Sequence, residues 1–311
     1  MYIEYRSISD LNDCIVKNLA KIPHDIDLVV GIPRSGMLPA NLLALYLNKP
    51  YTDIDSFVEG RVFSGGERTK VLDDKKSGKI LVVDDSINEG TALTKAKAKL
   101  DYLAEKYELI YAVVYATSLG SKKVDCFLEL IDGPRVFQWN MFHHKYMMGH
   151  ACCDIDGVLC LNPPIDDDGP LYKEYIEHAT PYIIPRVKID TLVSCRLEKY
   201  RAITEKWLAE HEIQYNNLVM LPFSTKEERI AWGKHGEYKG KVFKKHKDDV
   251  IFIESSLKEA VDIAKTSGKQ VFCTENFRMI YPDSNFMFRQ KRWLSFKVFV
   301  AKCLSKIGIK V

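Results

Sequence analysis

The chain has 311 residues, of which 46% are hydrophobic, so it is long enough for two domains and apolar enough to bury a core in each. Its eight cysteines show neither the paired spacing of a zinc site nor the density of a secreted disulfide scaffold. The formal net charge is +3, but residues 284–311 carry seven Lys and Arg and no acid, which leaves −4 for the rest and argues against a nucleic-acid-binding body.

The N-terminus MYIEYRSISDLND lacks the basic start and apolar core of a secretion signal. No uninterrupted apolar run approaches the roughly 18 residues of a membrane-spanning helix. We therefore expect a cytoplasmic protein in a reducing compartment, with membrane contact limited to the surface.

Short β-branched runs alternate with helix-forming segments along the first half of the chain. The runs are LVVGI at 28–32, ILVVD at 80–84 and LIYAVVYAT at 109–117, and helices are expected over GMLPANLLALYL and over 91–106. This alternation is typical of a parallel sheet with helical crossovers.

The alternation restarts after His150, with the runs ACCDI, KIDTLVS, NNLVML, DVIFIES and KQVFC. The predicted fold class is α/β, with two doubly wound domains of mainly parallel sheets and a C-terminal amphipathic helix. The predicted parts are domains at 1–142 and 149–285 and a basic amphipathic tail at 286–311.

The run at 80–84 ends in two carboxylates, Asp84 and Asp85, and the small turn Asn88 to Thr91 follows. In open α/β sheets ligands bind at the carboxyl ends of strands, and a helix N-terminus offers backbone N–H groups to phosphate. Carboxylates suit sugar hydroxyls or a metal, so this segment favours a phosphorylated sugar.

VVDDSINEGTAL resembles the phosphoribosyl pyrophosphate motif of type I phosphoribosyltransferases, and GIPRSGMLPA resembles their pyrophosphate loop. The resemblance implies that Asp84 and Asp85 bind the ribose 2- and 3-hydroxyls. It also implies that the 5-phosphate is held by Ser86, Asn88, Glu89, Gly90 and Thr91. The implied pyrophosphate site is made of Arg34, Ser35 and Gly36. Asn88 stands where purine-salvage relatives carry an acid, which disfavours a nucleobase acceptor, although orotate-type relatives also lack that acid.

The segment SFVEGRVFSGGERTKV resembles the mobile catalytic loop of the same family. Arg61 and Arg68 would bring cations to the departing pyrophosphate as the loop excludes water. Mg²⁺ would be shared with the pyrophosphate, because this ion usually takes few protein ligands and several substrate oxygens. Glu89 and Asp85 are both candidates for the acceptor base.

ACCDIDGVLC resembles motif I of the haloacid dehalogenase superfamily. The resemblance implies that Asp154 is the nucleophile that attacks phosphorus and that Asp156 protonates the leaving oxygen and then activates water. Later segments match the remaining motifs in order, with Ser194 as the phosphate-binding hydroxyl and Lys239, or next Lys241, as the motif III lysine. The implied metal ligands for Mg²⁺ are Asp154, Asp156 and Glu254. Ser255 stands where many relatives carry a second acid, and residues 161–187 are expected to form a small flap with one helix in place of a large cap.

The tail carries Trp293, Phe296, Val300, Leu304 and Ile307 at helical spacing, with lysines between them. A helix docked on its own domain and a helix bound to a membrane are equally compatible with this spacing. The absence of acids favours an anionic membrane surface over nucleic acid.

The two motif sets together resemble the fused phosphoribosyltransferase and phosphatase proteins associated with ribofuranose addition to bacterial surface polysaccharides such as O antigen. The resemblance implies 5-phosphoribosyl transfer to a lipid-linked glycan acceptor, followed by removal of the 5-phosphate at the inner face of the plasma membrane. One alternative is a nucleobase phosphoribosyltransferase fused to a nucleotidase. Another is a phosphoribosyl pyrophosphate sensor without catalysis, which the phosphatase motifs oppose.

Overall fold

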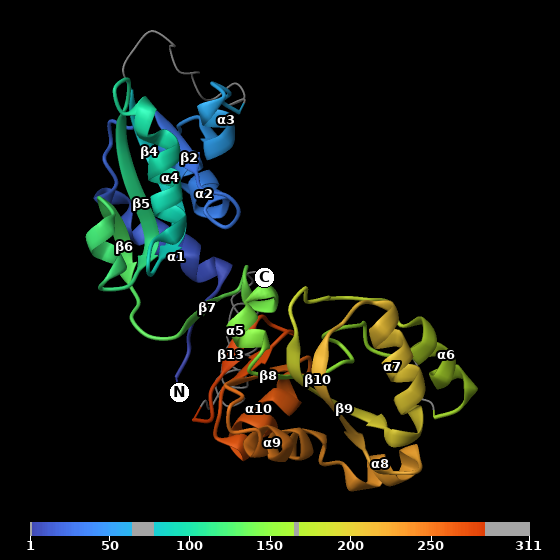
Figure 1. The fold of residues 1–311 in the computed structure, drawn as a ribbon. Coiled ribbons are helices and arrows are strands. Elements are labelled where there is room, and N and C mark those ends of the chain that lie inside the picture. Colours follow the sequence, from blue (N-terminus) through green and yellow to red (C-terminus); the bar gives the residue numbers. More distant parts are fainter. Residues whose placement is uncertain (1, 64–77, 165–167, 284–311) are drawn as a thin grey trace, which may run out of the picture. The chain divides into compact units, whose positions relative to one another are not determined.

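A computed structural model of the chain describes residues 2–63, 78–164 and 168–283 (Figure 1). These residues divide into two compact units, an N-terminal unit of Tyr2–Met141 and a C-terminal unit that begins at Phe142. Each unit alternates helices with a mainly parallel sheet, which confirms the predicted fold class. The amphipathic helix expected at 286–311 lies outside the described residues.

Five parallel strands form the main sheet of the N-terminal unit, in the order β3-β2-β4-β5-β6. Along β4 the side chains of Leu81 and Val83 join one buried cluster with α1 and α2, and those of Ile80 and Val82 join another with α3 and α4. Successive side chains of a strand point to opposite faces, so an unbroken apolar strand needs helices on both sides of the sheet.

A separate two-stranded sheet pairs β1 with β7 in parallel. The helices and strands of the N-terminal unit are β1 (Glu4–Arg6), α1 (Ile8–Asn18), η1 (Leu19–Lys21), β2 (Leu28–Gly31), α2 (Met37–Leu47), β3 (Tyr51–Asp53), α3 (Ile54–Val58), β4 (Lys79–Ile87), α4 (Thr91–Leu100), η3 (Asp101–Leu103), β5 (Glu108–Ala116), η4 (Gly120–Lys123), β6 (Cys126–Leu130) and β7 (Arg135–Phe137).

Six strands form the sheet of the C-terminal unit, in the order β10-β9-β8-β11-β12-β13, and β13 alone runs antiparallel to its neighbour. The strands β8 and β11 lie at its centre, and Cys152 and Cys153 of β8 are fully buried, as expected for core packing.

The short 3₁₀ segment η5 (Met141–His143) spans the division between the units. The elements of the C-terminal unit are α5 (Lys145–Met148), β8 (Ala151–Cys153), α6 (Pro170–His178), β9 (Ile189–Leu197), η6 (Glu198–Tyr200), α7 (Arg201–Glu210), β10 (Tyr215–Leu221), α8 (Lys226–Trp232), α9 (His235–Lys245), β11 (Ile251–Glu254), α10 (Leu257–Ser267), β12 (Val271–Cys273) and β13 (Arg278–Ile280).

Helices α9 and α10 pack closely because α9 has glycine where the two backbones approach. A Cβ atom on Gly236 would lie 2.7 Å from the Cβ of Asp262, and one on Gly240 would lie 2.7 Å from the Cβ of Thr266. Small residues spaced four apart fall on one helix face. This packing sets the position of Lys239, which lies between the two glycines in the sequence.

Several element boundaries differ from those expected. The helix expected over 91–106 ends at Leu100, its last buried residue, and a 3₁₀ turn follows. Strand β4 continues past its two acids to Ile87 because Ser86 and Ile87 still pair with β5, and β9 continues past Ser194 to Leu197. Of the described helices, none is long and apolar enough to span a membrane.

The close packing of α9 and α10 predicts that Gly240→Ala destabilises the C-terminal unit. The new methyl group would lie 2.7 Å from Thr266 Cβ and 3.1 Å from the carbonyl oxygen of Ile263, so the helices must move apart. We expect the free energy of unfolding to fall by about 1–3 kcal/mol, although alanine favours helix more than glycine does.

Urea denaturation followed by tryptophan fluorescence measures this change, since Trp207 and Trp232 lie in the C-terminal unit. The control is Lys244→Ala on the exposed side of α9, expected to stay within about 0.5 kcal/mol of the parent. Equal stability of Gly240→Ala and the control would show that the helices do not pack as described.

Candidate active sites

The loops expected to bind phosphoribosyl pyrophosphate lie side by side in the N-terminal unit. They follow β2 and β4, which are paired in the sheet, with Gly31 opposite Val83. Gly36 packs directly against β4, and a Cβ atom there would lie 2.5 Å from the carbonyl oxygen of Ile32 and 2.7 Å from that of Val83. Glycine at this position therefore allows the first loop to approach the strand that carries Asp84.

Asp84 and Asp85 are both buried, near the carboxyl end of β4. Burial, and then the negative charge of Asp85, raise the pKa of Asp84 to about 8. An Asp84 Oδ1 atom also accepts a hydrogen bond from the backbone N–H of Asp85 at 2.8 Å. Within the described residues neither carboxylate forms an ion pair, although Arg135 is near enough to Asp85 for their charges to interact. The two acids are therefore suited to a ligand that supplies hydroxyl donors.

Trp139 and Arg135 are neighbours of this acid pair that the sequence did not reveal. The indole Nε1–H of Trp139 donates to Asp85 Oδ2 at 2.6 Å, and the Trp139 ring stacks on Phe137 with centroids 4.9 Å apart. Arg135 donates to the backbone carbonyl of Ile87 at 2.8 Å. Both side chains come from the segment around β7, about 50 residues after the acids, so spacing alone gave no signal for them.

The expected 5-phosphate cradle lies where β4 passes into α4. Asn88, Glu89 and Thr91 are exposed, Ser86 is half-buried, and Gly90 has a positive φ of 84° at the N-terminus of α4. That backbone conformation favours glycine. Since Glu89 is exposed and Asp85 is bonded to Trp139, Glu89 is the freer of the two candidate bases.

The three expected arginines differ in what the structure describes of them. Arg34 is exposed, and its Nη2 donates to Asn140 Oδ1 at 3.2 Å. Arg61 is also exposed and forms an ion pair with Glu59, while Ser35 is half-buried. Arg68 lies outside the described residues.

The C-terminal unit contains a cavity of about 440 Å³ at the carboxyl ends of β8 and β11. Four of the residues expected in a phosphatase site line it, namely Asp154, Asp156, Lys239 and Glu254. Asn162, Pro163 and Tyr172, from the flap expected over 161–187, line it too. Ser194 is fully buried and accepts from the backbone N–H of Arg196 at 3.1 Å, and its neighbour Cys195 lines the cavity.

Lys239 is the centre of a buried charge cluster. Its Nζ atom lies 2.7 Å from Asp154 Oδ2, 2.7 Å from Glu254 Oε2 and 2.8 Å from Glu259 Oε2. Burial opposes its charge, but the three carboxylates outweigh this and raise the pKa of Lys239 well above its usual value. Lys241, the other candidate, is exposed and pairs with Glu237 at 2.6 Å.

Burial raises the pKa of the Asp154 carboxyl well above its usual value, and the negative charges of Glu254 and Asp156 add to this. Lys239 opposes the rise but does not outweigh it. Asp154 Oδ1 accepts from the backbone N–H of Ile155 at 2.8 Å. Glu254 Oε1 accepts from the backbone N–H groups of Ser255 and Ser256, each at 2.9 Å. The cluster is thus anionic overall and held in place by backbone donors.

Asp156 faces a different partner from Asp154. Its carboxylate receives hydrogen bonds from Arg196 Nη2 at 2.7 Å and Nε at 3.0 Å, and from the Tyr175 hydroxyl at 2.8 Å. Burial alone would raise its pKa, but Arg196, Tyr175 and Cys160 together lower it. Asp156 is therefore held in its ionised form, in a bidentate pair with a fully buried guanidinium.

Glu259 and Arg196 are site residues that the sequence reasoning missed. Glu259 contacts Lys239, and although burial opposes this, His235 and Lys239 lower its pKa to about 2. An acid five residues after Glu254, in the first turn of α10, was an available signal. Arg196 lies two residues after Ser194 on β9, which places both on the same side of the strand.

Among the described residues, one group of three His and acidic donors brings its ligand atoms within 4.8 Å of one another, and it is Asp190, His246 and Asp249. The expected set of Asp154, Asp156 and Glu254 does not meet that distance. Arg196 holds the Asp156 carboxylate, while Lys239 bridges Asp154 and Glu254.

Residues 5–143 match the family model for the phosphoribosyl transferase domain. The N-terminal unit is therefore a type I phosphoribosyltransferase domain, and the match supports phosphoribosyl transfer as its reaction and phosphoribosyl pyrophosphate as its substrate. The match ends close to the division between the two units.

Several solved phosphoribosyltransferases are similar to this part of the chain. Xanthine-guanine-hypoxanthine phosphoribosyltransferase from Helicobacter pylori is 18% identical, with 45% of this chain and 92% of that chain covered and a TM-score of 0.33. Purine phosphoribosyltransferase from Pyrococcus horikoshii is 22% identical, with coverages of 45% and 94% and a TM-score of 0.34. Orotate phosphoribosyltransferase from Aeropyrum pernix is 22% identical, with coverages of 39% and 70% and a TM-score of 0.30. A comparison with curated proteins finds no match.

The raised pKa of Asp84 predicts that Asp84→Asn stabilises β4 while it abolishes substrate binding. The ionised carboxyl costs stability progressively as pH rises from about 4, where the unfolded chain ionises, to about 8, where the folded chain does. The gain in the variant should therefore be smaller at pH 5 than at pH 8.5, where the parent bears the full cost of the ionised carboxyl.

Amide hydrogen exchange of β4 peptides, compared between parent and variant at the same pH, measures the gain. Calorimetric titration with phosphoribosyl pyrophosphate and Mg²⁺ measures binding. The control is Asp13→Asn, at an exposed acid of α1, which should change neither the hydrogen exchange of β4 nor the affinity for phosphoribosyl pyrophosphate. Unchanged affinity for phosphoribosyl pyrophosphate in Asp84→Asn would contradict the role at the ribose that the sequence predicts for Asp84.

Proposed function

We propose that the chain is a bifunctional ribofuranosyltransferase. The N-terminal unit transfers 5-phosphoribose from phosphoribosyl pyrophosphate to a hydroxyl of a lipid-linked glycan, and the C-terminal unit then removes the 5-phosphate. The buried cluster of Lys239 with Asp154 and Glu254, at the floor of a cavity, is the observation that carries the second step.

In the first step the N-terminal unit binds the donor and does not need a covalent intermediate. Asp84 and Asp85 accept hydrogen bonds from the ribose hydroxyls, and Ser86 to Thr91 hold the 5-phosphate at the start of α4. Arg34, Ser35 and Gly36 bind the pyrophosphate, and Arg61 and Arg68 stabilise it as it departs. Loss of pyrophosphate leaves an oxocarbenium-like C1, which the acceptor hydroxyl attacks as Glu89 removes its proton.

In the second step Asp154 attacks the phosphorus of the 5-phosphate and forms an aspartyl-phosphate, which water then hydrolyses. Lys239 Nζ, 2.7 Å from Asp154 Oδ2, holds the nucleophile and offsets the charge on the phosphoryl oxygens. Asp156 activates the water, a task that suits its ionised state. Protonation of the leaving oxygen by Asp156 requires that it take up a proton against the pull of Arg196.

Mg²⁺ fits this donor set, because five carboxylates line the cavity against few cations and would otherwise repel a phosphate. They are Asp154, Asp156, Glu254, Glu259 and Glu275. Asp154 and Glu254 would hold the ion, while Asp156 remains with Arg196. When bound, the ion would favour the ionised form of Asp154 and neutralise phosphate charge.

Both steps act on one ribose, which distinguishes this proposal from a fused nucleobase phosphoribosyltransferase and nucleotidase that would make and then break the same nucleotide. Product analysis decides between them. The intact chain is incubated with phosphoribosyl pyrophosphate, Mg²⁺ and either nucleobases or lipid-linked glycans, and the products are identified by mass. A ribosylated glycan with release of pyrophosphate and phosphate is the expected result, and a nucleotide product would end the proposal.

Asp154→Asn should uncouple the two steps. The amide keeps the shape of the neutral acid but cannot act as the anionic nucleophile, so 5-phosphoribosylated acceptor should accumulate while transfer continues. The measurement is inorganic phosphate release alongside acceptor mass. The control is Glu237→Gln, a partly exposed acid of α9 that pairs with Lys241 away from the cavity lining, expected to behave as the parent. Phosphate release by Asp154→Asn at the parent rate would show that Asp154 is misassigned.

The basic tail is proposed to bind the anionic inner surface of the plasma membrane, where the acceptor lies. Deletion of residues 289–311 should leave turnover of a short soluble acceptor nearly unchanged, because all the proposed site residues precede the tail. Activity on lipid-linked acceptor in anionic vesicles should fall at least about tenfold, since each tail cation contributes about 1 kcal/mol near such a surface.

Co-sedimentation of the chain with anionic vesicles at low and high salt tests the binding directly. Salt should weaken it for the intact chain. Equal sedimentation of intact and truncated chains would instead mean that the tail docks on its own domain.

A further inference from the structure

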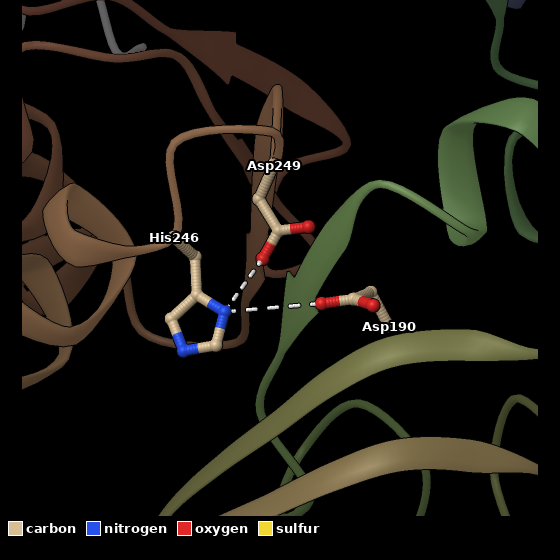
Figure 2. Close-up of side chains that lie close together, drawn as sticks. All are labelled: Asp190, His246 and Asp249. Carbon is tan, nitrogen blue, oxygen red and sulfur yellow. Dashed lines mark ion pairs between the residues drawn. The ribbon is translucent and has the colours of Figure 1, made fainter.

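Three side chains with metal-binding atoms meet at the opposite end of the C-terminal sheet from the cavity (Figure 2). Asp190 is the second residue of β9, and Asp249 lies two residues before β11, so both are at the amino ends of their strands. His246 is the residue that ends α9. None of the three lines the cavity that contains Asp154.

The two distances from His246 are too long for hydrogen bonds but suit ligands of one ion, and Asp190 and Asp249 lie close enough to share a hydrogen bond when one of them is protonated. His246 Nδ1 lies 3.6 Å from Asp249 Oδ2 and 3.8 Å from Asp190 Oδ2. Two ligand atoms bound to one Zn²⁺ at about 2.0–2.2 Å in tetrahedral geometry are roughly 3.4 Å apart. Figure 2 shows Nδ1 directed at both carboxylates and the other ring nitrogen directed away from them.

Among the described residues, the basic side chains whose charges act on Asp249 are His246 and Lys269. Within the described residues, neither carboxylate forms an ion pair with a lysine or arginine. Lys269 is near, but its Nζ donates to the backbone carbonyls of Phe243, His246 and Asp249. Asp249 is only 3% exposed, and two acids this close favour a bound cation.

Neighbouring side chains already orient the donor atoms. Asn216 donates to Asp190 Oδ1 at 2.9 Å, and Cys152 Sγ–H donates to Asp249 Oδ2 at 3.2 Å. The Thr191 hydroxyl donates to Asp190 Oδ2 at 2.8 Å and lies 3.3 Å from His246 Nδ1. Such outer contacts hold ligands in place before a metal binds. Asp190 and His246 are partly exposed, so an ion can enter from solvent.

We propose that Asp190, His246 and Asp249 form a binding site for one divalent transition-metal ion, with Zn²⁺ as the best match. One imidazole nitrogen with two carboxylate oxygens suits Zn²⁺ better than Mg²⁺ or Ca²⁺, which prefer all-oxygen sites. Water completes the coordination. The ion joins the C-terminal end of α9 to the starts of β9 and β11, and so stabilises the helix that carries Lys239 into the phosphatase site.

The test compares Zn²⁺ binding by the full chain with that of two variants. The protein is first treated with EDTA, then titrated calorimetrically with Zn²⁺ in excess Mg²⁺, which occupies the oxygen-rich sites. The parent should bind one more Zn²⁺ per chain than Asp190→Asn or His246→Gln, or bind it at least tenfold more tightly. Asp248→Asn removes an exposed acid next to the site and is the control, expected to match the parent.

Thermal unfolding provides the second measurement. Zn²⁺ should raise the Tm of the parent and of Asp248→Asn, and raise it less in the two site variants. Equal Zn²⁺ stoichiometry and equal Tm shifts in all four proteins would overturn the proposal. A loss of Zn²⁺ binding in Asp248→Asn as large as that in the two site variants would also overturn it. Neither measurement depends on phosphatase activity, so a failure of the proposed function leaves the result unaffected.

Discussion

Burial of carboxylates at the carboxyl ends of parallel strands is the constraint on which both proposed sites depend. In the N-terminal unit Asp84 and Asp85 lie near the end of the central strand β4, and in the C-terminal unit Asp154 and Glu254 lie at the ends of β8 and β11. A buried carboxylate costs free energy unless a donor, a cation or a ligand compensates it. The two units compensate in different ways.

The C-terminal unit supplies its own cations, Lys239 and Arg196, and both are almost completely buried. The N-terminal unit supplies an indole N–H to Asp85 and leaves Asp84 with a strongly raised pKa. The proposed phosphatase site is thus held together by ion pairs before any substrate binds. In the proposed phosphoribosyl pyrophosphate site, the free-energy cost of burying the Asp84 carboxylate is instead compensated only when ribose hydroxyls bind. Binding of the substrate should therefore stabilise β4.

The sequence was sufficient for the fold class and for the acids that lie near the strand ends, because unbroken β-branched runs with acids after them have a specific meaning in α/β sheets. It was not sufficient for contacts between segments far apart in the chain. Trp139 reaches Asp85 from about 50 residues away, and Arg196 reaches Asp156 from 40 away. Strand ends were also set too early at Asp85 and Ser194, since pairing with the neighbouring strand continues past a polar residue when the partner is long enough.

Helix α9 links the features of the C-terminal unit, because each part of it has a separate constraint. Gly236 and Gly240 set its distance from α10, Lys239 between them reaches the buried carboxylates, and His246 at its end faces Asp190 and Asp249. If α9 were held only at its middle, it could rotate or slide by a fraction of an ångström. Such a movement would be enough to weaken the 2.7 Å ion pair between Lys239 and Asp154. Lys269, which donates to the backbone carbonyl of His246 at 2.7 Å, restricts that motion at the end of the helix, and the proposed ion would restrict it further. With the ion bound, the position of the lysine would depend on contacts at the opposite end of the sheet as well as on the acids that it touches.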